Sequence, residues 1–195
     1  MGLDARTRYS KKMIKDSFLK LLLEQPIKKI TVTRICQLAD INRATFYKYY
    51  DDPFDLLEKI EQEFIDEIKE NLQHIEERDL QDTFVLLLEH VEKNRESFYA
   101  IAFQNGDSGF ASRLLSTVYE GTTHLFQERF PNLTESQQKM LYYFLAHGFG
   151  GTLGYWIMNG MQESSTEVAA FLEKLILDFH INFVHSIATS HDTNA

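Results

Sequence analysis

The chain has 195 residues, of which 44% are hydrophobic, and its 20 Lys and Arg against 29 Asp and Glu give a net charge of −9. This composition predicts a soluble globular protein of one or two domains. The single cysteine excludes an internal disulfide, and the net acidity, taken by itself, argues against a nucleic-acid partner. Only three prolines and no alternating strand pattern favour an all-α fold.

The first predicted helix covers residues 8–24 and follows a loose arm at residues 1–7. Ile14 and Phe18 fall on its apolar face, while the lysines fall largely off that face. Pro26 ends the helix because proline cannot continue a helical hydrogen-bond ladder.

Two short helices, expected at 32–39 and 43–49, have the pattern of a helix-turn-helix motif. Small or apolar residues stand where these helices touch: Ile35, Cys36, Ala39, Ile41, Phe46 and the amphipathic Tyr49. Asp40 occupies the turn position that prefers left-handed backbone angles, which aspartate tolerates better than most residues. We therefore expect a DNA-reading motif; the alternative is an αα-hairpin that merely packs.

The outward face of this motif mixes a bidentate donor, a small residue, hydroxyls and a base. Such a set suits the edge of a DNA major groove and its flanking phosphates. Its members are Thr31, Thr33, Arg43, Ala44, Thr45, Tyr47 and Lys48.

The charge is unevenly divided along the chain. Residues 1–50 hold 11 Lys and Arg against 4 Asp and Glu, a net +7, whereas residues 51–195 hold 9 against 25, a net −16. A basic first quarter on an acidic body would orient the reading end toward phosphate.

The rest of the chain predicts further helices. Asp52 and Pro53 are a favoured N-cap and first-turn residue for a linker helix that reaches about His74. Helices are then expected at 80–95, 97–104, 110–130, 135–160 and 166–188, about nine in all, and Thr134 with Gln137 forms a capping box. The expected domains are a DNA-binding domain at 1–52, a linker helix at 53–76 and a regulatory and dimerisation domain at 77–195.

Residues 140–162 contain no Lys, Arg, Asp or Glu, long enough for a transmembrane helix. Five glycines, polar residues and the lack of flanking positive charge favour a buried helix in a helical body instead. Each glycine inside a helix costs about 0.5–1 kcal/mol relative to alanine, so close approach of another helix is expected.

The last helix is apolar on two sides, which indicates a partner on each side. A second copy of the chain is the simplest partner, through a four-helix interface; burial in the chain's own core is the alternative. The expected interface residues are Gly151, Tyr155, Phe171, Leu175, Phe179 and Phe183.

Aromatic residues between positions 98 and 156 are candidates for a ligand pocket, although aromatics at helical spacing also fill cores. The candidate lining residues are Phe98, Phe103, Phe110, Tyr119, Tyr143, His147 and Trp156. Their surroundings would suit an uncharged, partly aromatic or hydrophobic ligand.

Nothing in the sequence indicates an enzyme. The seven histidines have no metal-ligand spacing, and no GxSxG motif or phosphate-binding glycine loop is present. We expect no catalytic residue, metal or cofactor, and we interpret Cys36 as a small buried contact residue. With no signal peptide at the N-terminus, a cytoplasmic protein is expected.

Residues 8–57 resemble the N-terminal domain of TetR-type transcriptional regulators. They share its leading helix, the pattern T-V-x-x-I-x-x-x-A and an aromatic run at Phe46–Tyr50. The stretch from Ser97 to Ile157 is similar to the C-terminal domain of Firmicute members of that family.

The resemblance implies that Arg43, Ala44, Thr45 and Lys48 face bases and nearby phosphates. Thr33, Tyr47 and Tyr49 would mostly touch the DNA backbone, and Thr31 would cap the first reading helix. Two departures matter: Asp40 replaces the usual turn glycine, and Pro53 replaces the lysine that commonly begins the linker helix and touches phosphate.

The resemblance also implies a homodimer on double-stranded DNA, with no membrane partner. The expected function is a repressor released from a pseudo-palindromic operator by a small-molecule effector. The alternative is an activator whose C-terminal domain docks a partner protein, as a resemblance to dihydroxyacetone-kinase regulators of this family permits.

Overall fold

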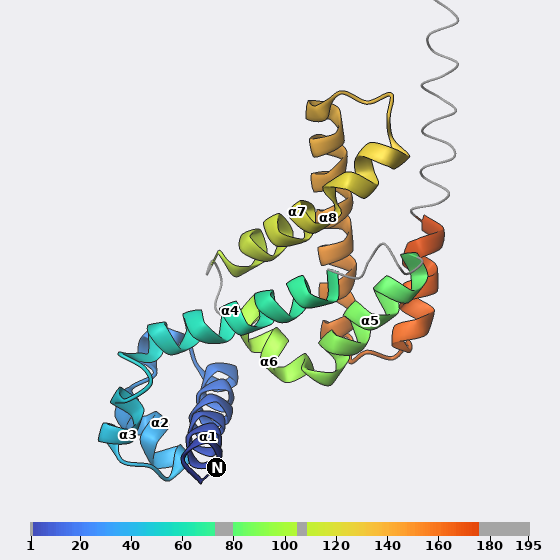
Figure 1. Cartoon of the computed structure of the whole chain (residues 1–195). Helices are drawn as coiled ribbons and strands as arrows, with labels where there is room; N and C mark the ends of the chain where they lie inside the picture. The colour runs from blue at the N-terminus through green and yellow to red at the C-terminus, as the bar shows by residue number, and fades with distance from the viewer. Residues whose placement is uncertain (1, 73–79, 105–108, 176–195) are drawn as a thin grey trace, which may run out of the picture. The chain divides into compact units, whose positions relative to one another are not determined.

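The computed structural model describes residues 2–72, 80–104 and 109–175, and these residues are helical without any strand (Figure 1). The all-α class is therefore confirmed. The chain divides into two compact units. Unit 1 comprises Met1–Glu67 and Asn94–Leu114, and unit 2 comprises Ile68–Lys93 and Leu115–Ala195.

Helices follow one another with short connections. Unit 1 contains α1 (Gly2–Glu24), the 3₁₀ helix η1 (Ile27–Lys29), α2 (Val32–Ala39), α3 (Arg43–Tyr47), most of α4 (Pro53–Leu72), α6 (Arg95–Tyr99), the π-helical segment η3 (Ala100–Gln104) and the start of α7 (Phe110–Arg129). Unit 2 contains the end of α4, α5 (Leu80–Lys93), most of α7, α8 (Glu135–Met158) and a helix at 165–175.

Helix α1 is longer than the sequence indicated. The expected loose arm at residues 1–7 is wrong, because the helix begins at Gly2. Ala5 and Arg6 are good helix formers, and the Tyr49 hydroxyl donates to the Thr7 hydroxyl oxygen at 3.5 Å, which places this first part of α1 beside the end of α3.

The core of unit 1 holds the helix-turn-helix together. Helix α1 packs against α2, and α2 packs against α3. Ile14, Phe18, Ile35 and Phe46, which come from these three helices, are fully buried. Burying a side chain of this size contributes about 1.5–3 kcal/mol, so this core determines how the reading helices are presented.

Segment 94–114 packs on the helix-turn-helix, which the sequence did not indicate. The linker helix was expected to be the only connection between head and body, but α1 also packs against α6 and η3. Phe64 of α4 lies edge-on to Phe98 and Phe110, with ring centroids 6.3 and 6.5 Å away. Movement of α6 would therefore reach the head through α1 as well as through α4.

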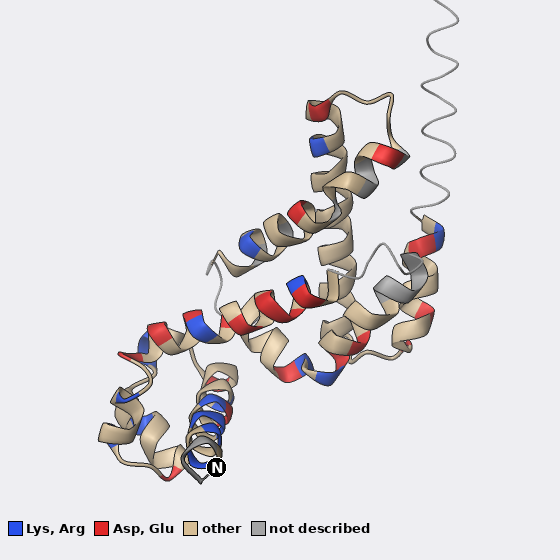
Figure 2. Ribbon diagram, in the orientation of Figure 1, with Lys and Arg blue, Asp and Glu red and all other residues tan. Residues whose placement is uncertain are grey.

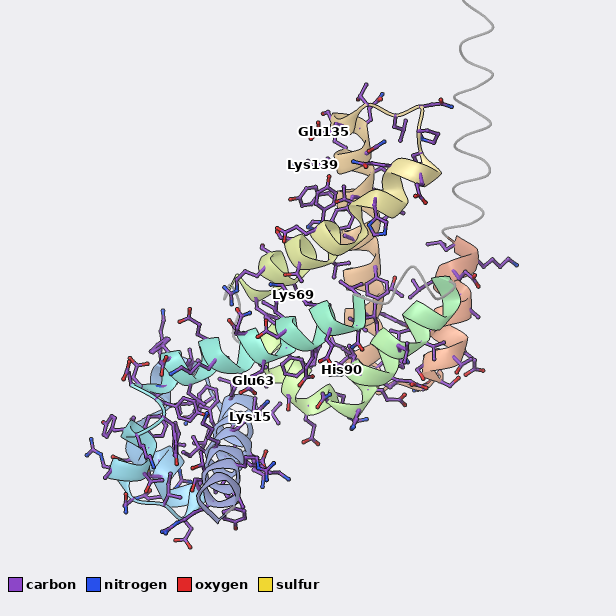
Figure 3. The ribbon with its side chains drawn as sticks, viewed as in Figure 1. Lys15, Glu63, Lys69, His90, Glu135 and Lys139 are labelled. Carbon is purple, nitrogen blue, oxygen red and sulfur yellow. The ribbon has the colours of Figure 1, made fainter. Side chains whose placement is uncertain are left out.

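Two ion pairs fasten α4 within unit 1. Arg113, at the start of α7, pairs with the buried Glu61 of α4. Lys15 of α1 pairs with Glu63 at 2.8 Å (Figure 3). The second pair is largely exposed and contributes at most about 1 kcal/mol, whereas the buried carboxylate of the first makes its partner more important.

Replacing Arg113 with alanine should destabilise unit 1 by about 1–3 kcal/mol, because the buried Glu61 carboxylate loses its guanidinium donor. Urea unfolding followed by circular dichroism measures the change. The double variant Arg113→Ala/Glu61→Gln removes the buried charge and should recover part of the loss. Equal stability of the single variant and the natural protein would contradict this role for the pair.

Unit 2 has a separate core. Leu88, Trp156, Ala169 and Leu172 are buried, and the Trp156 indole donates to the Glu163 carbonyl at 2.9 Å. The capping box expected at the start of α8 is confirmed, with Thr134 and Gln137 each accepting from the other's backbone N–H.

One face of α8 is exposed rather than buried, contrary to the sequence expectation. Its residues recur every three or four positions and so lie on one side of the helix. We define the α8 stripe as Met140, Phe144, His147, Gly148, Gly151, Tyr155 and Met158, all exposed. A Cβ atom added at Gly148 or Gly151 meets no neighbour within 4 Å, so no helix in the described part of the chain approaches these glycines. None of the described helices is both long and apolar enough to span a membrane.

Candidate nucleic-acid interface

The two reading helices begin at side-chain caps. Thr31 accepts a hydrogen bond from the Arg34 backbone N–H at 3.2 Å, which confirms its expected role as the cap of α2. Asn42 Oδ1 accepts from the Thr45 N–H at 2.8 Å and from its hydroxyl at 3.0 Å. Asp40 adopts φ 52° and ψ 48° between the helices, so the left-handed turn is also confirmed.

Replacing Asn42 with alanine should lower the free energy of unfolding by about 1 kcal/mol, because α3 has five residues and loses its cap. Thermal unfolding measures the change. Gln37→Ala on the exposed side of α2 is the matched control and should leave stability within about 0.5 kcal/mol. A destabilisation no larger than that of the control would show that the cap is unimportant.

The outward face of α3 presents a paired arginine and tyrosine. Arg43, Ala44, Tyr47 and Lys48 are exposed, as expected. Arg43 Nη2 donates to the Tyr47 hydroxyl at 3.1 Å, and its guanidinium carbon lies 5.7 Å from the centre of the Tyr47 ring. The tyrosine thus holds the long arginine side chain over the face of α3. Thr45 is half-buried and its hydroxyl is engaged by the Asn42 cap.

The end of α3 is fastened to the start of α4. Lys59 donates to the Tyr49 carbonyl at 3.1 Å and to Asp55 at 2.8 Å. The hydrogen bond from Lys59, followed by that from the Asp51 N–H, lowers the pKa of Asp55. Asp52 caps α4 by accepting from the Phe54 and Asp55 N–H groups at 2.7 and 2.9 Å.

Positive charge gathers in the first three helices. In Figure 2 the Lys and Arg positions run along α1, whereas acidic positions predominate along α4. Thr31 and Thr33 are exposed at the start of α2, and Tyr49 is half-buried. The structure therefore brings the eight candidate DNA-contact residues together within unit 1.

The candidate pocket residues divide between the two units. Phe98 and Phe110 are buried in unit 1, their ring centroids 6.2 Å apart. In unit 2, Trp156 is buried, Tyr119 is half-buried, and Tyr143 and His147 are exposed on α8. The side chain of Phe103 lies outside the described residues. The pocket stays a prediction.

The candidate dimer residues that are described are exposed. Tyr155 is 68% exposed, Phe171 58% and Leu175 52%, and Gly151 lies on the α8 stripe. Phe179 and Phe183 lie outside the described residues. Sequence reasoning missed Met140, Phe144 and Met158, although their spacing to Gly151 and Tyr155 places them on the same helix face.

Within the described ranges, no three His, Cys, Asp or Glu side chains are grouped so that they could hold a metal ion. Cys36 is buried between the reading helices, and burial raises the pKa of its thiol. A buried thiol of raised pKa is a poor nucleophile, in keeping with a packing role.

The fold is that of a DNA-binding regulator with a helix-turn-helix head, and comparison with known proteins identifies its family. Residues 78–178 match the TetR-type family model described as a transcriptional regulator C-terminal region. The match covers more than half of the chain. The protein belongs to the TetR family of transcriptional regulators.

Solved structures support the same fold. A TetR transcriptional regulator from Streptococcus agalactiae 2603V is 22% identical, with a TM-score of 0.67 over 90% of this chain and 98% of that one. The dihydroxyacetone kinase operon activator DhaS is 21% identical, with a TM-score of 0.60 over 87% and 94%. NalD from Pseudomonas aeruginosa, the secondary repressor of the MexAB-OprM multidrug efflux pump, is 13% identical, with a TM-score of 0.69 over 88% and 96%. No curated protein matches the sequence.

Proposed function

We propose that this protein is a homodimeric regulator that represses transcription by binding a pseudo-palindromic operator and is released by a small-molecule effector. The observation that carries DNA binding is the exposed Arg43, Tyr47 and Lys48 face of α3, on a helix whose start is fastened by Asn42. In this proposal residues 1–52 read DNA, 53–76 link, and 77–195 regulate and dimerise.

The chemistry of the α3 face favours a major-groove role. An arginine fork can donate two parallel hydrogen bonds to guanine O6 and N7. Tyr47 restrains the Arg43 side chain before binding, which reduces the entropy lost when the contact forms. Thr33, Ala44, Thr45 and Tyr49 then complete the contact with bases or backbone.

The α8 stripe supports a second copy of the chain as its partner. The stripe combines large exposed apolar residues with glycines over which nothing lies. Glycines allow two helix backbones to approach closely, and the exposed Phe171 and Leu175 extend the apolar surface to the next helix. A two-fold pair would present two reading helices to successive turns of DNA.

The repressor role and the effector rest on less specific support. NalD is a repressor and DhaS is an operon activator, so both roles occur on this fold. For the repressor, an effector must bind the DNA-incompetent arrangement more tightly; a coupling of about 1–3 kcal/mol would change DNA affinity about 5- to 150-fold. The packing of α6 and η3 on α1 offers a route for that coupling. If the role is activation, a partner protein takes the place of the effector.

Gel shifts with DNA from upstream of the protein's own gene test DNA binding, with a scrambled duplex as control. Selective retardation of the upstream DNA is expected, and equal binding to both would contradict operator recognition. A small-molecule thermal-shift screen beside a pull-down then separates the two modes. A compound that raises the melting temperature and releases DNA supports the effector, whereas a captured protein partner without such a compound supports the alternative.

A further inference from the structure

Helix α1 brings an additional cation to the reading surface. Thr7 and Lys11 are four residues apart on α1 and so share one face. Thr7 accepts from the Tyr49 hydroxyl at 3.5 Å, and the Lys11 ammonium lies 5.7 Å from the centre of the Tyr49 ring. Lys48 lies 5.5 Å from the same ring centre. Two ammonium groups from different helices therefore flank one tyrosine.

These two lysines differ from their neighbours in their ion pairs. Lys15 pairs with Glu63 and Lys59 pairs with Asp55. Among the described residues, no carboxylate pairs with Lys11 or Lys48, and both side chains are exposed. Their charges thus remain available to an external anion. The Thr7 hydrogen bond, and then the charges of Lys48 and Lys11, lower the pKa of Tyr49, in agreement with a positive local field.

The start of α4 supplies no such cation. Pro53 is buried there, between the acidic residues Asp51, Asp52 and Asp55, and Lys59 is held by Asp55 and the Tyr49 carbonyl. A DNA phosphate beside the end of α3 would therefore find its positive partners on the α1 side of Tyr49.

We propose that Lys11 of α1, together with Lys48 and the Tyr49 hydroxyl, forms a phosphate-binding site that contacts the DNA backbone beside the recognition helix. This inference rests on the proposed DNA-binding function and extends the interface to α1. A phosphate oxygen accepts from both ammonium groups and from the phenol, which exchanges its Thr7 partner for the stronger anionic acceptor. The contact carries no sequence information, so it strengthens binding to every duplex equally.

Two cations beside a tyrosine ring also have a purely structural explanation. Cation–π contacts at exposed sites stabilise a fold modestly, and Lys11 would then only fasten α1 to α3. The two explanations differ in their dependence on salt. A lysine that neutralises a phosphate releases a counterion on binding, and its loss lowers the slope of log K against log salt by about 0.9. A structural lysine leaves that slope unchanged.

The test measures binding of Lys11→Gln to a mixed-sequence duplex and to the upstream DNA by fluorescence anisotropy between about 50 and 200 mM salt. We expect binding about three- to tenfold weaker on both duplexes and a slope smaller by about one. Lys20→Gln, the same charge change at an exposed position further along α1, is the matched control and should shift affinity less than about twofold. Lys11→Arg should restore binding, since it keeps the charge.

An unchanged slope in Lys11→Gln, with or without a lower melting temperature, would overturn the proposal. Equal losses in the Lys11 and Lys20 variants would also overturn it, because they would reflect net charge alone. Arg43→Ala separates this failure from failure of the proposed function. If Arg43→Ala weakens upstream DNA binding while Lys11→Gln does not, only the phosphate site is wrong; if the natural protein binds neither duplex, the proposed function itself is wrong.

Discussion

Replacing Arg43 with alanine should cost about 1–3 kcal/mol of discrimination, or roughly 10- to 100-fold, between the operator and a duplex with its guanine contact replaced. The reason is that Arg43 is exposed on α3 and held by Tyr47, so its fork can meet two acceptors on one base. Anisotropy titrations with matched duplexes measure the ratio of affinities, which should fall toward one in the variant.

Two control variants separate base reading from charge. Arg43→Lys keeps the charge but loses the fork, so it should retain non-specific affinity and lose most discrimination. Tyr47→Phe and Lys48→Ala should weaken all duplexes more evenly, since a phosphate contact is insensitive to sequence. Undiminished discrimination in Arg43→Ala would remove this residue from the base-reading role.

Placing a charge on the α8 stripe should dissociate the dimer. Tyr155→Glu alters a side chain that is 68% exposed in the single chain, and Gly151→Glu adds a charged side chain where two helix backbones would meet. Burying an unpaired carboxylate in an apolar interface costs several kcal/mol, enough to raise the dimer dissociation constant by at least about 100-fold. Light scattering over a concentration series measures the change.

Lys139→Glu is the matched control for the interface, because Lys139 is exposed on α8 but lies outside the stripe. It should leave the dimer intact. Operator affinity should fall together with dimerisation in the stripe variants, since two half-sites must be engaged at once. A monomeric natural protein at micromolar concentration, or a dimer indifferent to charges at both stripe positions, would contradict this interface.

The helix-turn-helix was predictable because local rules determine it. Thr31 as a cap, Asp40 in the left-handed region and Phe46 in the core each follow from residue type and spacing. The structure agrees with local sequence preference at every one of these positions, which is the condition under which sequence patterns are most informative.

The features that the sequence missed depend on contacts between distant segments. Nothing near Phe98 or Arg113 indicates that they pack against Phe64 and Glu61 some 35 to 50 residues earlier. Likewise, Lys11 joins the reading surface only because α1 lies beside Tyr49. The exposed α8 face was misjudged because an uncharged apolar helix looks alike whether it meets its own core or a second copy.

The measurement that tests the central claim most directly is a footprint of the protein on DNA upstream of its own gene. The account predicts two protected half-sites of related, inverted sequence, with centres about 34–36 Å apart or a multiple of that spacing. Protection should disappear in Arg43→Ala and in Tyr155→Glu, which alter base reading and pairing separately. A single unpaired protected site, or protection that survives both substitutions, would contradict a dimer that reads DNA through α3.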